Sequence, residues 1–464
     1  MKFSELLKNI PGVSRLISAL GIDKAIFYNI ISVLWSSVAG IIAIYFIVSY
    51  LTLAQQGYWY TFISLGALAT FAELGFTTII TQFISHEYAH LKEENGKLTG
   101  DPTFVERAIS LVRFSLKFYL VVTTAAFIFL SIVGILFLMS STNDLYLFMA
   151  WVAYSFTGAF LLLVSLFGAV LKGFNKVDVV QKNITIAAFA SNVSTWIALY
   201  AGYNIWALAV GGIVNIILSL FLFIHSFRPL WDQIFHTKIE GSYNWLKETL
   251  PLQWRYAISW GSGYFIFQFI VPVTMFYAGP DIAGKLGLSL VIARAVQNIA
   301  NSWGMTKVPQ FNIYVAQKKR YNLDKLLENI QKQSLLVFVA GSLAVVVILI
   351  YAFPILNWDT RILPIYEIVI ILIAEGANLV VFNWAYYLRS HKKEPYVRIS
   401  AVSAVLIGVG VWLGMYLTHS TLVVLSIYCI IALVMLIPAW RIFKNESKRY
   451  MDNYYNQDDE LLDL

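Results

Sequence analysis

The sequence predicts an all-α polytopic membrane protein with about twelve transmembrane helices and both termini in the cytoplasm. Of its 464 residues, 59% are hydrophobic and only 13% are charged, whereas a soluble domain has about 25% charged residues. Apolar runs of about 20 residues, the length that crosses the hydrocarbon core, recur along the whole chain. Lysine and arginine gather in alternate connections between these runs, as they do in cytoplasmic loops.

The apolar runs form two groups of six, separated by the long connection Arg228–Pro251. The fifth run contains the most polar residues. The twelve predicted spans are Ala25–Leu51, Tyr58–Phe83, Ile109–Met139, Leu147–Leu171, Lys182–Tyr200, Ile205–Phe227, Trp254–Ala278, Leu286–Thr306, Leu335–Phe353, Ile365–Leu388, Ile399–Leu417 and Leu422–Ile442.

The distribution of basic residues predicts the orientation of the spans. One set of connections, together with both termini, holds almost every lysine and arginine outside the spans, and the alternate set holds only Lys285 and Arg361. The outer connections, among them Thr52–Gly57 and Gly279–Gly284, are too short to form an external domain. The net charge of +7 therefore reflects membrane topology, and we expect no nucleic-acid partner.

Three regions follow from this organisation. We expect an N-terminal lobe at residues 1–227, with an interfacial helix before the first six spans. A cytoplasmic linker follows at 228–250, and a C-terminal lobe occupies 251–464. A short internal repeat supports this division, because Tyr50–Gly57 and Tyr277–Gly284 have identical spacing at the ends of the first and seventh spans.

The eighth span carries an arginine far from either end. Arg294, Asn298 and Asn301 recur at i, i+4 and i+7 and share one helix face, with Gln297 beside it. A charge at mid-membrane costs about 3 kcal/mol on insertion scales, so it must face a polar environment. Two interpretations remain open: Arg294 lines a substrate cavity, or it pairs with a carboxylate, for which Glu375 is the best candidate by depth.

Two carboxyl groups are candidates for coupling transport to an ion gradient. Glu73 lies near the middle of the second span, on a predicted helix face with Thr70, Thr77 and Thr81. Glu375 lies in the tenth span. The alternative for Glu73 is a buried hydrogen bond to a neighbouring helix.

A cationic pair begins the third span. Arg113 and Lys117, at i and i+4, lie one to three turns above the predicted cytoplasmic surface. They are candidates for binding an anionic head group at the inner leaflet. The alternative is that their long side chains extend to the lipid headgroups.

Few enzyme signatures are present in the sequence. It contains no phosphate-binding glycine-rich loop and only one cysteine, and we expect a non-enzyme without a metal or cofactor. The single cysteine, Cys429, cannot form an intrachain disulfide.

Two stretches carry a family resemblance: QQGYWYTFISLGALATFAELGF (Gln55–Phe76) and PLQWRYAISWGSGYFIFQF (Pro251–Phe269). They resemble bacterial polysaccharide-biosynthesis membrane proteins, the oligosaccharide-flippase branch of the multidrug/oligosaccharidyl-lipid/polysaccharide exporter superfamily. The resemblance implies two six-helix lobes around a central cavity. It implies a multi-pass protein of the bacterial inner membrane that moves an undecaprenyl-pyrophosphate-linked oligosaccharide, for O-antigen lipopolysaccharide or capsule, to the outer leaflet by alternating access. Polysaccharide-assembly proteins are its expected partners.

The resemblance implies a cationic cavity that binds the anionic lipid head group, and Arg294, Arg113 and Lys117 are the candidates for it. It also implies a carboxylate that couples transport to an ion gradient, for which Glu73 or Glu375 is the candidate. Three other functions remain open. The first is a small-molecule cation antiporter of the same superfamily, with Glu73 as its cation-linked site. The second is a membrane polysaccharide polymerase or ligase, which the short outer loops disfavour, and the third is a scaffold for glycan-assembly enzymes.

Overall fold

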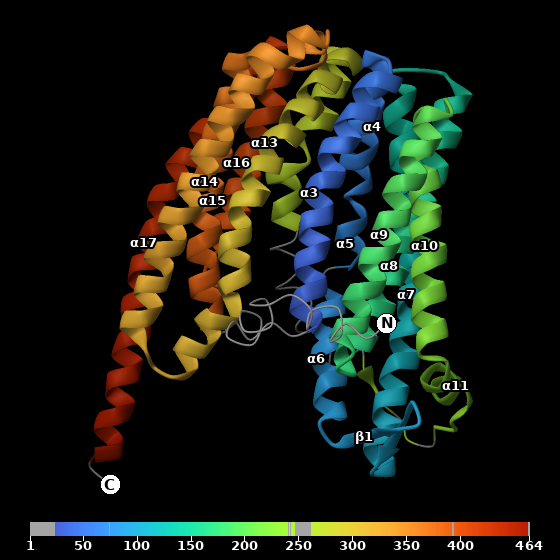
Figure 1. Ribbon diagram of the computed structural model, residues 1–464, viewed down its shortest axis with the longest axis vertical. Coiled ribbons are helices and arrows are strands. Elements are labelled where there is room, and N and C mark those ends of the chain that lie inside the picture. Colours follow the sequence, from blue (N-terminus) through green and yellow to red (C-terminus); the bar gives the residue numbers. More distant parts are fainter. Residues whose placement is uncertain are drawn as a thin grey trace, which may run out of the picture. The chain divides into compact units, whose positions relative to one another are not determined.

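The computed structural model describes residues 24–73, 75–239, 241, 243–245, 261–391 and 394–462. These residues form long helices and one small hairpin (Figure 1). The main elements are α3 (Lys24–Tyr50), α4 (Leu53–Gly66), α5 (Ala69–Glu73), α6 (Phe76–Tyr88), β1 (Leu91–Glu94), β2 (Lys97–Gly100), α7 (Pro102–Met139), α8 (Leu145–Gly173), α9 (Val177–Tyr200), α10 (Trp206–Ser226), α11 (Arg228–His236), α13 (Ile270–Ala316), α14 (Arg320–Ile355), η1 (Asp359–Arg361), α15 (Ile365–Ser390), α16 (Val397–Thr418) and α17 (Thr421–Leu462).

The helices confirm an all-α polytopic membrane protein. Within the described ranges, eight helices are long and apolar enough to cross a membrane, or nine if the bent pair Leu53–Glu73 and Phe76–Tyr88 is one span. Helical structure is present at each of the twelve predicted positions. The count is lower than twelve in part because the seventh and eighth spans merge in Gly261–Val315. The predicted interfacial helix before residue 24 lies outside the described residues.

A single glycine separates the seventh and eighth spans. Gly279 has φ 84° and ψ 175°, and helical structure resumes at Pro280. Glycine adopts this backbone conformation without steric cost, and proline is favoured at the first position of a helix. The predicted six-residue outer loop Gly279–Gly284 is therefore wrong: all but its first residue belongs to the helix.

The second predicted span is broken into three helices. α5 ends at Glu73, and α6 begins at Phe76, after Gly75 in the left-handed conformation with φ 72°. The predicted continuous helical face through Thr70, Glu73, Thr77 and Thr81 is therefore wrong, because the helix is interrupted in the middle of that series.

The chain divides into two compact units. Unit 1 contains the described residues of Met1–Phe46, Phe71–Ile135 and Asp144–Trp254. Unit 2 contains those of Ile47–Thr70, Leu136–Asn143 and Arg255–Leu464.

Close helix packing forms the core of unit 1. Helix α10 packs against α8 and α9, and α6 packs against α8. The buried Trp151 indole donates a hydrogen bond to the Leu130 carbonyl at 2.9 Å. A Cβ on Gly134 would lie 2.0 Å from the Trp151 ring, so only glycine allows this ring to sit against α7.

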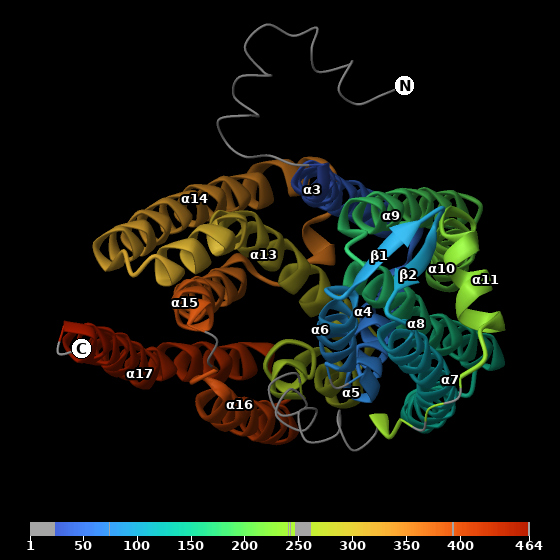
Figure 2. The ribbon, with the colours of Figure 1, turned by 90° about the horizontal axis from the view of Figure 1, so that it is seen from below.

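A β-hairpin, which the sequence analysis did not predict, caps one end of unit 1. Its turn is Asn95-Gly96, with φ 51° and 76°, and Glu94 pairs with Lys97. The amide of Gln233 on α11 binds both backbone groups of Leu98, at 2.7 and 2.8 Å. These hydrogen bonds connect β2 to α11, which lies beside it (Figure 2).

Unit 2 is organised around α13. This helix packs against α4, α14 and α15, and α17 packs against α15 and α16. The contact between α4 and α13 is very close, because a Cβ on Gly57 would lie 1.9 Å from the Pro280 oxygen, and one on Gly284 would lie 2.8 Å from the Leu53 oxygen. Gln56 donates a hydrogen bond to the Gly284 carbonyl at 2.8 Å.

Candidate functional site

A buried ion pair lies at the centre of unit 2. Arg294 on α13 donates a hydrogen bond from Nε to Oε1 of Glu375 on α15 at 3.2 Å. The Glu375 side chain has no exposed surface, and 20% of the Arg294 side chain is exposed. The predicted pairing of these two residues is confirmed.

Polar groups from three helices surround the Glu375 carboxylate. The Tyr428 hydroxyl on α17 donates to Oε1 at 3.1 Å, and the Asn378 amide donates to Oε2 at 3.4 Å. Gln297, four residues before Asn301 on α13, donates to the Glu375 backbone oxygen at 3.3 Å. Both carboxylate oxygens thus have donors, as a buried charge requires.

The Arg294 guanidinium retains unused donor capacity. Its Nη2 atom is buried and has no hydrogen-bond partner among the described residues. The Phe267 ring lies 5.8 Å from the guanidinium carbon, which is within the range of a cation–π contact. A guanidinium carries five N–H donors in a planar fork, and only the Nε donor reaches Glu375. Among the described residues, the Nη2 donors therefore have no acceptor.

The polar face predicted on α13 is present, and its members have different environments. Asn298 is exposed and Gln297 is buried. The Oδ1 atom of Asn301 accepts a hydrogen bond from the Tyr386 hydroxyl at 3.2 Å. The sequence did not predict the contacts of Tyr386, Tyr428 and Phe267. An aromatic residue in a transmembrane span can pack against any neighbouring helix, so its sequence position does not identify its partner.

Glu73 lies in unit 1, at the end of α5. Its Oε1 atom accepts a hydrogen bond from the Thr77 hydroxyl across the break between α5 and α6. Thr81 instead donates to the Ala169 carbonyl on α8 at 3.1 Å. The structure therefore brings Thr77 to Glu73 but turns Thr81 to another helix.

Arg113 joins two elements of unit 1. Its Nε and Nη2 atoms donate to the carbonyls of Ile234 and Thr237, both at 2.6 Å. These carbonyls lie at the carboxyl end of α11, where a cation is favoured by the helix dipole. Lys117 is exposed and has no ion pair with a described residue. This geometry gives Arg113 a structural contact and leaves Lys117 accessible.

Solved structures provide the comparison for this fold. An inward-facing multidrug resistance MATE family transporter of the MOP superfamily aligns with TM-score 0.65 and 13% identity, over 91% of this chain and 96% of the other. The lipid II flippase MurJ, in an inward closed conformation, aligns with TM-score 0.63 and 12% identity, over 92% and 91%. No protein-family model and no curated protein matches the sequence.

The chain has the fold of MOP-superfamily transporters. A further structure, of a MATE protein in complex with MaL6, aligns with TM-score 0.53 and 13% identity over 91% of this chain and 94% of the other. The fold expected from the sequence is confirmed by these structures. At this identity, the likeness does not extend to the substrate.

Proposed function

We propose that the chain is a flippase for an undecaprenyl-pyrophosphate-linked oligosaccharide, an O-antigen or capsule-type repeat unit. It moves this substrate from the inner to the outer leaflet of a bacterial inner membrane by alternating access, driven by an ion gradient. The observation that carries the proposal is the Nη2 atom of Arg294, which has no partner among the described residues and lies inside a membrane-spanning helix beside Glu375.

The chemistry of Arg294 suits a pyrophosphate. A planar guanidinium binds two anionic oxygens at once, and in a site with little water such charge-assisted bonds are stronger than neutral ones. Glu375 holds Nε at 3.2 Å and so limits the rotation of the guanidinium. The role of Glu375 is then to position Arg294, while the Nη atoms contact the substrate.

Polar groups near Arg294 suit the sugar. Each hydroxyl group that enters an apolar medium without a partner costs several kcal/mol, so a sugar chain needs a polar path. Asn298 and Asn301 continue the polar face of α13 beyond Arg294. Lys117 remains a candidate for first contact with an anionic head group, because its amine is exposed and unpaired among the described residues.

A second candidate function is a drug-type cation antiporter. The structural likeness to a multidrug resistance transporter favours it, and in this function Glu73 would supply the carboxylate for a proton or a cation. In unit 2, however, Glu375 is already paired with Arg294, so this cluster has no free negative charge to attract a cation. The geometry of unit 2 therefore favours an anionic substrate.

A binding experiment separates the two functions. Undecaprenyl pyrophosphate or a cationic dye is added to the purified protein in detergent, and the shift in melting temperature is measured. We expect undecaprenyl pyrophosphate to stabilise the parent protein, Arg294→Gln to abolish the shift, and Arg389→Gln to retain it. Arg389 is the matched control because it is half-exposed and pairs with Glu394 at 2.7 Å. Stabilisation by the dye alone would support the antiporter and contradict the flippase.

A further inference from the structure

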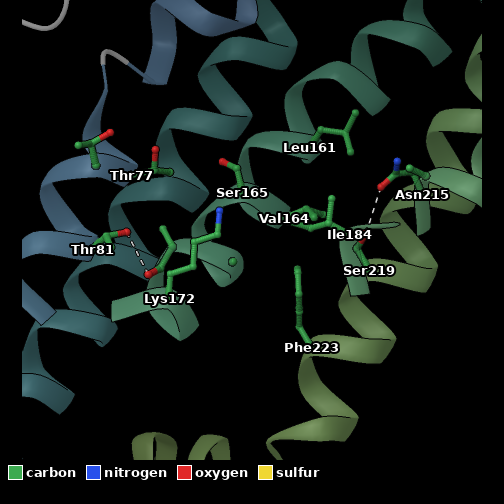
Figure 3. Close-up of a pocket in the computed structure, with 14 residues that line it drawn as sticks. Thr77, Thr81, Leu161, Val164, Ser165, Lys172, Ile184, Asn215, Ser219 and Phe223 are labelled. Atoms are coloured by element: carbon green, nitrogen blue, oxygen red, sulfur yellow. Dashed lines mark hydrogen bonds between the residues drawn. The ribbon is translucent and has the colours of Figure 1, made fainter. Parts of the chain in front are cut away.

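Unit 1 contains a pocket that the proposed function does not use. Its volume is about 380 Å³, and it lies among α6, α8, α9 and α10 (Figure 3). This volume lies within the range of small-molecule sites, about 300–1,000 Å³. The lining residues are Thr77, Thr78, Thr81, Leu161, Val164, Ser165, Gly168, Ala169, Lys172, Ile184, Ala188, Asn215, Ser219 and Phe223.

Lys172 is the single charged residue in this lining. Its side chain is half-buried, and its amine has no hydrogen bond or ion pair with any described residue. Figure 3 shows this side chain extended toward Ser165, with Thr77 and Thr81 on the neighbouring helix. The pocket therefore contains one unneutralised positive charge among neutral polar groups.

The surrounding polar groups include further free donors. The Oδ1 atom of Asn215 accepts a hydrogen bond from Ser219 at 3.1 Å, which leaves the Asn215 Nδ2 group without a partner among the described residues. Thr78 is exposed and its hydroxyl is equally unused. Amine, amide and hydroxyl donors around one space are suited to an anion with several oxygen atoms.

The rest of the wall is apolar. Leu161 and Val164 on α8, Ile184 on α9 and Phe223 on α10 line the space beside the polar groups. A ligand that fills the pocket thus needs an anionic part and an apolar part. A cation is disfavoured, because Lys172 would repel it and no carboxylate is in the lining.

An alternative is that Lys172 extends to water as many lysines do at the end of a span. Two neighbouring lysines of this unit are either exposed or ion-paired. Lys182 is exposed, and Lys176 pairs with Glu93 at 2.5 Å. Lys172 does neither: it lines a pocket and lacks an ion pair.

We propose that the pocket of unit 1 is a binding site for a phosphate group, with Lys172 as its counter-charge and Asn215 and Thr78 as additional donors. The phosphate comes either from a lipid headgroup, whose glycerol and acyl carbons contact the apolar wall, or from free phosphate. This site is separate from Arg294, and it is expected whether the chain transports an oligosaccharide or a drug.

The test measures phosphate binding by the full-length protein. Native mass spectrometry counts bound phosphatidylglycerol against phosphatidylcholine, and calorimetry measures the binding of inorganic phosphate. A charge-assisted hydrogen bond contributes enough for Lys172→Gln to weaken binding about tenfold or more. We expect Lys172→Arg to keep binding, because it keeps the charge. Lys182→Gln is the matched control, since it removes a lysine outside the pocket.

A second variant leaves the charge in place. Ala188 lines the pocket, so Ala188→Leu is expected to fill part of it and weaken binding while Lys172 remains. Loss of phosphatidylglycerol binding in both variants would identify a lipid headgroup, and loss of inorganic phosphate binding alone would identify a free anion. Equal binding of both probes by the parent, Lys172→Gln and Lys182→Gln would overturn the proposal.

Discussion

The Nε atom of Arg294 lies 3.2 Å from Oε1 of Glu375, although 81 residues separate them in sequence. The pair joins α13 to α15, and Tyr428 extends it to α17. Three helices of unit 2 thus meet at one carboxylate. Glu375 is thus satisfied, which is a structural function of the pair. The Nη2 atom of Arg294 has no acceptor among the described residues, which is the basis of the second, proposed function of substrate contact.

The first prediction separates these two functions. Arg294→Ala leaves Glu375 buried without its cation, and removal of one partner of a buried pair costs about 3–5 kcal/mol. We expect a lower melting temperature for Arg294→Ala and a partial recovery in the double variant Arg294→Ala/Glu375→Gln, because the neutral amide no longer needs a cation. Thermal unfolding in detergent measures both.

Transport by the same double variant completes this test. If Arg294 contacts the substrate, the double variant stays inactive although it is stable. If Arg294 only joins the helices, transport recovers together with stability. Recovery of transport would contradict the role proposed for the guanidinium.

The second prediction concerns Glu73. Glu73→Gln keeps an oxygen that accepts the hydrogen bond from Thr77, so the protein should fold, but the amide cannot bind a proton. We expect gradient-driven transport in reconstituted vesicles to fall to the level seen without a gradient. Glu94→Gln, on the exposed hairpin, is the control and should transport normally. Normal gradient-driven transport by Glu73→Gln would assign Glu73 a structural role.

The third prediction concerns the close contact of α4 with α13. Gly57→Ala places a methyl group where the Pro280 oxygen already lies, so the two helices must separate. Overpacking of this kind costs about 1–3 kcal/mol. Gly158→Ala is the control, because nothing lies within 4 Å of its Cβ position. We expect a lower melting temperature for Gly57→Ala only; equal melting temperatures would show that the contact is looser than the structure indicates.

The fourth prediction concerns topology. In a variant with Cys429 replaced by alanine, single cysteines at the exposed positions Asn143, Asp281 and Asp359 should react with a membrane-impermeant thiol reagent added outside the cell. A cysteine at Glu94, in the hairpin, should react only after the membrane is opened. Gly57 is unsuitable for labelling because it is buried against Pro280. Labelling of Glu94 in intact cells would reverse the predicted orientation.

The helical spans were predictable because their signal is local. A run of about 20 apolar residues identifies a span wherever it packs. The hairpin also had a local signal that was not used, since Asn95-Gly96 between short alternating segments is typical of a two-residue β-turn. Glu375 could be predicted as the partner of Arg294 from the similar depth of the two residues in the membrane, because few partners exist for a charge there.

Other features depend on contacts that no local pattern encodes. Arg113 binds the backbone carbonyls of Ile234 and Thr237. Every residue has a backbone carbonyl, so the sequence does not reveal which of them an arginine binds. The pocket around Lys172 requires four helices to pack, so its lysine could not be distinguished from its neighbours in sequence. The break after Glu73 was missed because glycine also occurs within transmembrane helices.

The most direct test of the flippase is a translocation measurement. The purified protein is reconstituted into vesicles with a fluorescent undecaprenyl-pyrophosphate-linked oligosaccharide, and a membrane-impermeant reagent quenches the label in the outer leaflet. We predict that an imposed ion gradient increases the fraction translocated by the parent and by Arg389→Gln, while the stable double variant Arg294→Ala/Glu375→Gln translocates no more than empty vesicles. Translocation by this double variant at the parent's rate, or none by the parent, would contradict the account.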